Sequence, residues 1–70
     1  MKEKALQILK DNIVYYYGIK YNKIWTRSEE ETAYCELTAV YETLRDLGLV
    51  TKEEYRTMKT EIHDSMRKTA

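Results

Sequence analysis

The sequence predicts an all-α fold, in which a tight antiparallel hairpin of two helices packs against a first helix. The 70 residues include no proline and only two glycines, so few positions interrupt a helix. Two Ser/Thr-x-x-Glu patterns mark helix starts, and apolar residues recur three and four positions apart. We therefore expect a single domain, residues 1–70, with helices at roughly 2–21, 28–47 and 52–67.

The first expected helix places its apolar residues on one face. These residues are Leu6, Leu9, Ile13 and Tyr16 or Tyr17. The β-branched and aromatic residues that follow would also suit a strand, but a lone strand would leave its backbone groups without partners. Gly18 is expected to end this helix, to kink it, or to allow another helix to cross closely.

The second expected helix begins with a capping box of Ser28 and Glu31. Its apolar stripe consists of Ala33, Leu37, Val40, Leu44 and Leu47. Gly48 then fits the left-handed position that ends many helices, and Leu49 would fold back towards Leu44.

The third expected helix begins with a capping box of Thr51 and Glu54, and Val50 is placed to pack on Tyr55. Its apolar stripe consists of Tyr55, Met58, Ile62 and Met66. Because the connection to the preceding helix is short, the two helices should be antiparallel, with their stripes facing each other.

Residues 44–62, "LRDLGLVTKEEYRTMKTEI", resemble the helical hairpin of the SHOCT family of short C-terminal domains. The residues that carry the resemblance are Leu44, Gly48, Val50, Thr51, Glu54, Tyr55 and Lys59. The resemblance implies a small helical module used for oligomerisation or docking, without catalysis.

The sequence offers no signature of an enzyme, a cofactor site or a metal site. One cysteine and one histidine cannot form a disulfide or a four-ligand Cys/His zinc site. We expect Cys35 to be a small buried residue, and His63 to be exposed or near a helix end. Three consecutive glutamates, residues 29–31, would point in three directions at a helix start and suit its positive end rather than one ion.

Size and hydropathy indicate where the protein works. A chain of 70 residues buries only about 60% of its unfolded surface, so we expect oligomerisation or docking on a partner to stabilise it. The N-terminal apolar run is interrupted by Lys10 and Asp11, which is unlike a signal peptide, and no run is long enough to span a membrane. We expect a cytoplasmic protein that does not bind membranes.

The segment "IVYYYGIKYNKIWTR", residues 13–27, holds five of the eight aromatic residues and three cations. Residues 1–27 contain six basic and two acidic residues, whereas residues 28–50 contain one basic and six acidic residues. Three consecutive tyrosines cover about 300° of a helix, so at least one must face away from the core. Tyrosine and tryptophan are enriched in protein interfaces, and we predict partner binding by Tyr15, Tyr17, Tyr21 and Trp25.

The predicted function is therefore a small non-catalytic interaction or adaptor module that binds another protein or itself, with a homodimer as the expected state. Its size is compatible with an inhibitor or regulator from a phage or mobile element. The alternative is nucleic-acid binding, in which tyrosines stack on bases and cations contact phosphates. The cations for that alternative are Lys20, Lys23 and Arg27.

Overall fold

The computed structural model describes residues 1–22 and 26–69, and these residues form three helices without a strand. The helices are α1 (Lys2–Tyr21), α2 (Arg27–Asp46) and α3 (Lys52–Thr69). The predicted all-α three-helix fold is confirmed, and the observed helix bounds agree with the expected ones to within two residues. The tyrosine-rich part of α1 is helical as far as Tyr21, so the strand alternative is wrong for the described residues.

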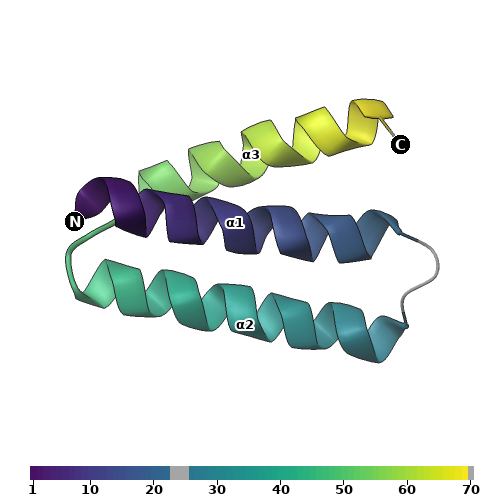
Figure 1. Ribbon diagram of the computed structural model, residues 1–70, viewed down its shortest axis with the longest axis horizontal. Coiled ribbons are helices and arrows are strands. Elements are labelled where there is room, and N and C mark those ends of the chain that lie inside the picture. Colours follow the sequence, from purple (N-terminus) through teal and green to yellow (C-terminus); the bar gives the residue numbers. More distant parts are fainter. Residues whose placement is uncertain (23–25, 70) are drawn as a thin grey trace.

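Helix α1 lies between the other two helices (Figure 1). Helix α2 runs antiparallel to α1, and α3 turns back so that it runs antiparallel to α2 (Figure 1). Helices α2 and α3 contact each other much less than each contacts α1. Their main link is a stacked pair of rings near the turn, Tyr41 and Tyr55, with centroids 3.9 Å apart.

The expectation that the stripes of α2 and α3 face each other therefore needs correction, because both stripes pack on α1. The reason is the wide apolar arc of α1, which is broad enough to contact two helices. Its buried residues are Ala5, Leu9, Ile13, Tyr16, Tyr17 and Ile19. A narrower apolar stripe on α1 would have left α2 and α3 to cover each other.

The core is built mainly from α1 and α2. Helix α2 contributes Ala33, Leu37, Tyr41 and Leu44, and the turn contributes Val50. Helix α3 contributes only partly buried residues, which are Tyr55, Met58, Ile62 and Met66. Leu47 was expected in the stripe of α2 but is 66% exposed, because α2 ends at Asp46 and Leu47 is its C-cap.

The N-cap of helix α2 lies two residues before the predicted cap. Thr26, rather than Ser28, is the N-cap, and its hydroxyl accepts a hydrogen bond from the Glu29 backbone N–H at 3.2 Å. Thr26 and Glu29 have the same Ser/Thr-x-x-Glu spacing as the predicted pair, so both patterns satisfy the sequence rule. Ser28 lies in the first turn, where its carbonyl accepts a hydrogen bond from the Thr32 hydroxyl.

The turn between α2 and α3 follows the prediction closely. Gly48 has φ +74°, the left-handed conformation that glycine adopts at lowest cost. The Leu49 N–H donates to the Leu44 carbonyl and the Gly48 N–H donates to the Arg45 carbonyl, each at 2.9 Å. These two hydrogen bonds form a complete Schellman motif, as expected.

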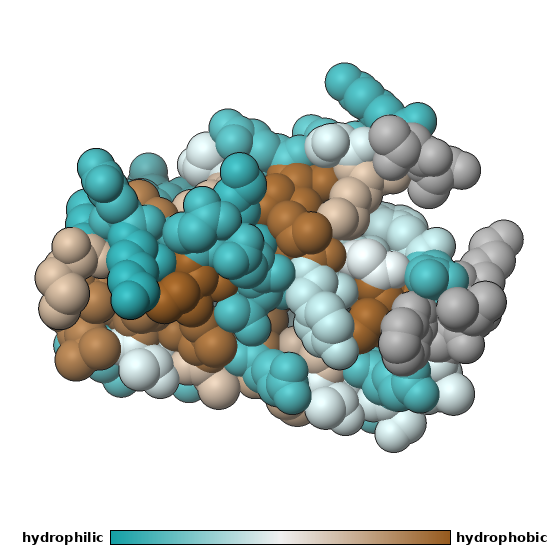
Figure 2. Space-filling model, viewed as in Figure 1, coloured by the Kyte–Doolittle hydropathy of each residue, from teal (hydrophilic) through white to brown (hydrophobic). Residues whose placement is uncertain are grey.

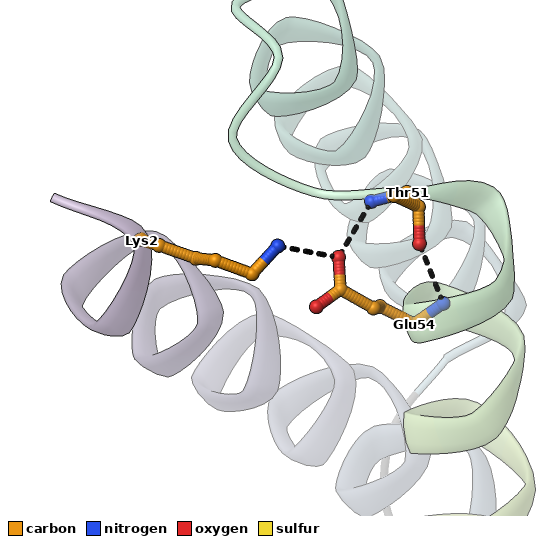
Figure 3. Close-up of polar contacts among 3 residues, drawn as sticks. All are labelled: Lys2, Thr51 and Glu54. Atoms are coloured by element: carbon orange, nitrogen blue, oxygen red, sulfur yellow. Dashed lines mark hydrogen bonds and ion pairs between the residues drawn. The ribbon is translucent and has the colours of Figure 1, made fainter.

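The predicted capping box of α3 is present (Figure 3). The Glu54 N–H donates to the Thr51 hydroxyl at 3.1 Å, and the Thr51 N–H donates to Glu54 Oε1 at 2.9 Å. The same oxygen accepts a hydrogen bond from Lys2 Nζ, also at 2.9 Å. The first turn of α1 is thereby joined to the first turn of α3.

Gly18 neither ends α1 nor allows another helix to cross closely, which are two of the roles expected for it. Helix α1 continues through Gly18 to Tyr21. A methyl group added at Gly18 would meet nothing within 4 Å, so no other helix crosses closely there.

None of the described helices combines the length and apolar character needed to cross a lipid bilayer.

Candidate functional site

A chain of aromatic rings crosses the molecule at the C-terminal half of α1. The ring of Tyr16 lies 5.6 Å from Tyr34 on α2 and 5.0 Å from Tyr17, measured between centroids. The ring of Tyr17 lies 5.1 Å from His63 on α3. Burial raises the pKa values of Tyr16 and Tyr17, as expected for phenols withdrawn from water. Much of the tyrosine-rich segment therefore forms the core that holds the three helices together.

The four residues predicted to bind a partner lie in different environments. Tyr15 is 54% exposed and remains available for contact. Tyr17 is only 7% exposed, so it is a core residue and the prediction of a surface role for its side chain is wrong. Tyr21 is half-buried, and its hydroxyl is hydrogen-bonded to His63 Nε2. Trp25 lies outside the described residues.

The described cations of the nucleic-acid alternative lie beside different tyrosines, Lys20 beside the buried Tyr17 and Arg27 beside the exposed Tyr34. Lys20 Nζ lies 5.8 Å from the centroid of the Tyr17 ring. Arg27 begins α2, where its Nε lies 3.6 Å from Glu31 Oε1. Lys23 lies outside the described residues. The described residues of this set therefore form no single strand-binding surface.

A different basic site lies in an open cleft between α1 and α3, with a volume of about 280 Å³. The cleft is lined by Tyr17, Arg56, Lys59, Thr60 and His63. The α3 residues are spaced at i, i+3, i+4 and i+7, which places them on one face of the helix. The sequence analysis did not predict this group, because it considered only the cations beside the tyrosines. The sequence signal for the group is the helical spacing of Arg56, Lys59 and Thr60.

The lining of the cleft carries net positive charge, although Glu61 lies with Arg56 and Thr60 in an adjoining pocket. No carboxylate is among the lining residues of the cleft, and none of the ion pairs between described residues involves Arg56 or Lys59. Lys59 Nζ instead lies over the Tyr55 ring, 5.0 Å from its centroid. The ammonium of Lys59 is thus attracted to a ring face rather than to a carboxylate.

The structure corrects the expectations for the two chemically reactive side chains. His63 is half-buried against Tyr17 and Tyr21 rather than exposed, and its Nδ1 lies 3.8 Å from the carboxylate of Asp64. Cys35 is exposed on α2 rather than buried. Helix periodicity places Cys35 beside the core stripe, and the rotation of α2 towards α1 leaves it on the solvent side.

Glutamates 29–31 lie near the start of α2, where the positive helix end favours acidic side chains. Within residues 1–22 and 26–69, no group of three or more His, Cys, Asp or Glu side chains is arranged to hold a metal ion.

The outward face of α1 carries a second candidate surface, made of exposed apolar side chains. Met1, Ile8 and Tyr15 recur every seven residues, and all three are exposed. A spacing of seven places Ile8 and Tyr15 on one line along α1, and the N-cap residue Met1 precedes the helix at the same spacing. We call them the α1 stripe. Figure 2 shows apolar surface in separate patches along the middle of the pictured face, interrupted by polar side chains.

Comparison of the chain with protein-family models, with curated proteins and with solved structures finds no match. The resemblance of residues 44–62 to the SHOCT hairpin therefore stays a prediction. The local structure there is a helix end, a glycine turn and a capped helix start, which capping chemistry alone can produce.

Proposed function

We propose that this chain is a small non-catalytic protein-interaction module of the cytoplasm, and that its partner is a second copy of itself. The observation that carries the proposal is the α1 stripe, in which Ile8 and Tyr15 are exposed on one face of the central helix and the exposed N-cap residue Met1 continues the seven-residue spacing. Apolar side chains aligned along a helix are typical of a face that packs on another helix.

The charges beside the α1 stripe favour an antiparallel pair of α1 helices. Lys4 and Asp11 are exposed on this face, one on each side of Ile8. A two-fold axis beside Ile8 would bring Lys4 towards Asp11 of the partner subunit, and Met1 towards Tyr15 of the partner subunit. A parallel pair would instead place like charges together.

The proposed dimer is weak, because one helical stripe buries little surface. An interface of this kind falls below about 1,200 Å², the range of transient complexes. We expect a dissociation constant between about 10 µM and 1 mM. A homodimer of this strength would respond to protein concentration.

Sedimentation velocity over a range of protein concentrations tests the proposal. The wild-type chain should shift from monomer to dimer, and Ile8→Glu should remain monomeric because two carboxylates would meet at the axis. Leu47→Glu is the matched control, since it places the same charge on an exposed apolar residue outside α1, at the C-cap of α2. A wild-type chain that stays monomeric at millimolar concentration, or an Ile8→Glu variant that still dimerises, would contradict the proposal.

Nucleic-acid binding has less support than self-association. Its described cations, Lys20 and Arg27, lie on different helices, and Arg27 is paired with Glu31. Stacking on bases needs accessible ring faces, and Tyr17, the ring beside Lys20, is buried.

A further inference from the structure

The cleft between α1 and α3 gathers hydrogen-bond donors of the kinds that hold oxyanions. Arg56 supplies a guanidinium, Lys59 an ammonium and Thr60 a hydroxyl, all from two turns of α3. Arginine and lysine are the usual protein partners of phosphoryl groups, and charge-assisted hydrogen bonds are the stronger kind.

The electrostatics of the cleft favour an anion. Like charges three positions apart on a helix repel each other, and Arg56 and Lys59 have this spacing without an intervening carboxylate among the lining residues. Lys20, which is not among the lining residues, places a third ammonium 5.8 Å from the centroid of the Tyr17 ring. A bound anion would relieve this repulsion.

The shape and the aromatic wall indicate a small ligand rather than a nucleic-acid strand. A volume of about 280 Å³ lies just below the range of about 300–1,000 Å³ for small-molecule pockets. The tyrosines beside the cleft offer little ring surface for stacking, since Tyr17 is buried and the hydroxyl of Tyr21 is bound to His63. Strand binding would need several exposed rings along a groove.

We propose that the cleft binds the phosphoryl group of a small phosphorylated ligand, with Arg56, Lys59 and Thr60 as the contacting residues. This inference goes beyond self-association and uses a different face of α1, so either proposal can fail without the other.

Two-dimensional ¹H–¹⁵N NMR of the full chain, titrated with inorganic phosphate at constant ionic strength, tests the site. We expect saturable shifts confined to the cleft residues of α1 and α3. The double variant Arg56→Gln, Lys59→Gln should weaken binding at least about tenfold, because it removes two charge-assisted contacts. Glutamine is a good helix former, so α3 should remain folded, and the dispersion of the spectrum reports this directly.

The matched control is the double variant Arg67→Gln, Lys68→Gln, which removes one guanidinium and one ammonium from exposed positions of α3 outside the cleft lining. Its phosphate affinity should equal that of the wild type. Shifts that do not saturate, or equal weakening in both double variants, would overturn the inference in favour of general charge screening.

A second titration, with unphosphorylated and 5′-phosphorylated thymidine and then with a ten-nucleotide thymidine strand, separates the sources of the phosphoryl group. We expect the 5′-phosphorylated nucleoside to bind and the unphosphorylated one to fail. Much tighter binding of the strand, with a salt dependence that indicates several phosphate contacts, would overturn the small-ligand assignment.

Discussion

Lys2 Nζ lies 2.9 Å from Glu54 Oε1, so the first helical residue of α1 is joined to the first turn of α3 (Figure 3). An exposed ion pair by itself contributes little to stability. Here the same carboxylate oxygen also accepts the Thr51 N–H and completes the cap of α3. The contact therefore fixes the start of α3, the helix whose side chains are the least buried of the three.

The cap of α3 should make stability depend on pH in the acid range. The hydrogen bond from Lys2, followed by that from the Thr51 backbone, lowers the pKa of Glu54. A lowered pKa stabilises the fold fully above the ordinary glutamate value of about 4.3, and this contribution is lost as pH falls through the lowered pKa.

We therefore expect Glu54→Gln to lower the melting temperature at pH 7, and the difference from wild type to shrink between about pH 5 and pH 3. Circular dichroism melts at several pH values measure this. Glu53→Gln is the control, because Glu53 lies in the same helical turn and is in neither the ion pair nor the capping box. Identical acid profiles for wild type and Glu54→Gln would show that the cap contributes nothing.

Gly48→Ala should destabilise the protein by about 1 kcal/mol. Its φ of +74° strains a residue that carries a Cβ, although space around the site is open. Urea unfolding followed by circular dichroism measures the change in free energy. An unchanged midpoint would mean that the turn relaxes into another conformation.

Gly18→Ala should instead stabilise the protein, and we expect its free energy of unfolding to rise by about 0.5–1 kcal/mol. Gly18 is exposed within α1, has ordinary helical geometry and would place a methyl group in open space. The same urea experiment applies. A loss of stability would indicate that α1 needs the freedom of glycine at this position.

The protein should lose stability in alkali before all its tyrosines ionise. Burial raises the pKa of Tyr55 to about 12, so the folded chain keeps this phenolic proton where an unfolded chain releases it near pH 10. The contribution is present below about pH 10 and is lost as pH rises through about 12.

Absorbance at 295 nm together with circular dichroism, from about pH 8 to pH 12.5, follows ionisation and unfolding in one sample. Tyr55→Phe keeps a ring to stack on Tyr41 and should reduce the alkaline loss of stability. Tyr16 and Tyr17, whose pKa values are also raised, account for the loss that remains. Ionisation of every tyrosine near pH 10 without unfolding would contradict this account.

The helices and the turn were predictable because local chemistry determines them. Gly48 and the pair Thr51–Glu54 leave the backbone one favourable arrangement, whichever helix packs nearby. The prediction of Ser28 as the N-cap of α2 was wrong because Thr26 offers the same capping chemistry two residues earlier.

Relative placement of the helices could not be read from the sequence in the same way. The sequence does not determine whether α3 packs on α2 or on α1, because the apolar stripe of α3 could pack on either helix. The positions of Cys35, His63 and Tyr17 depend on that choice, and so does the basic cleft, which exists only where α3 lies beside α1.

Self-crosslinking of single cysteines tests the antiparallel dimer most directly. In a Cys35→Ser background, the thiol introduced by Ile8→Cys lies beside the two-fold axis and should form a disulfide with the same thiol of a second chain under mild oxidation. Tyr15→Cys should not crosslink, because Tyr15 faces Met1 of the partner subunit. Efficient dimerisation through Ile8→Cys alone is the predicted result. Equal or faster crosslinking of Tyr15→Cys would indicate a parallel or random encounter and contradict the proposed interface.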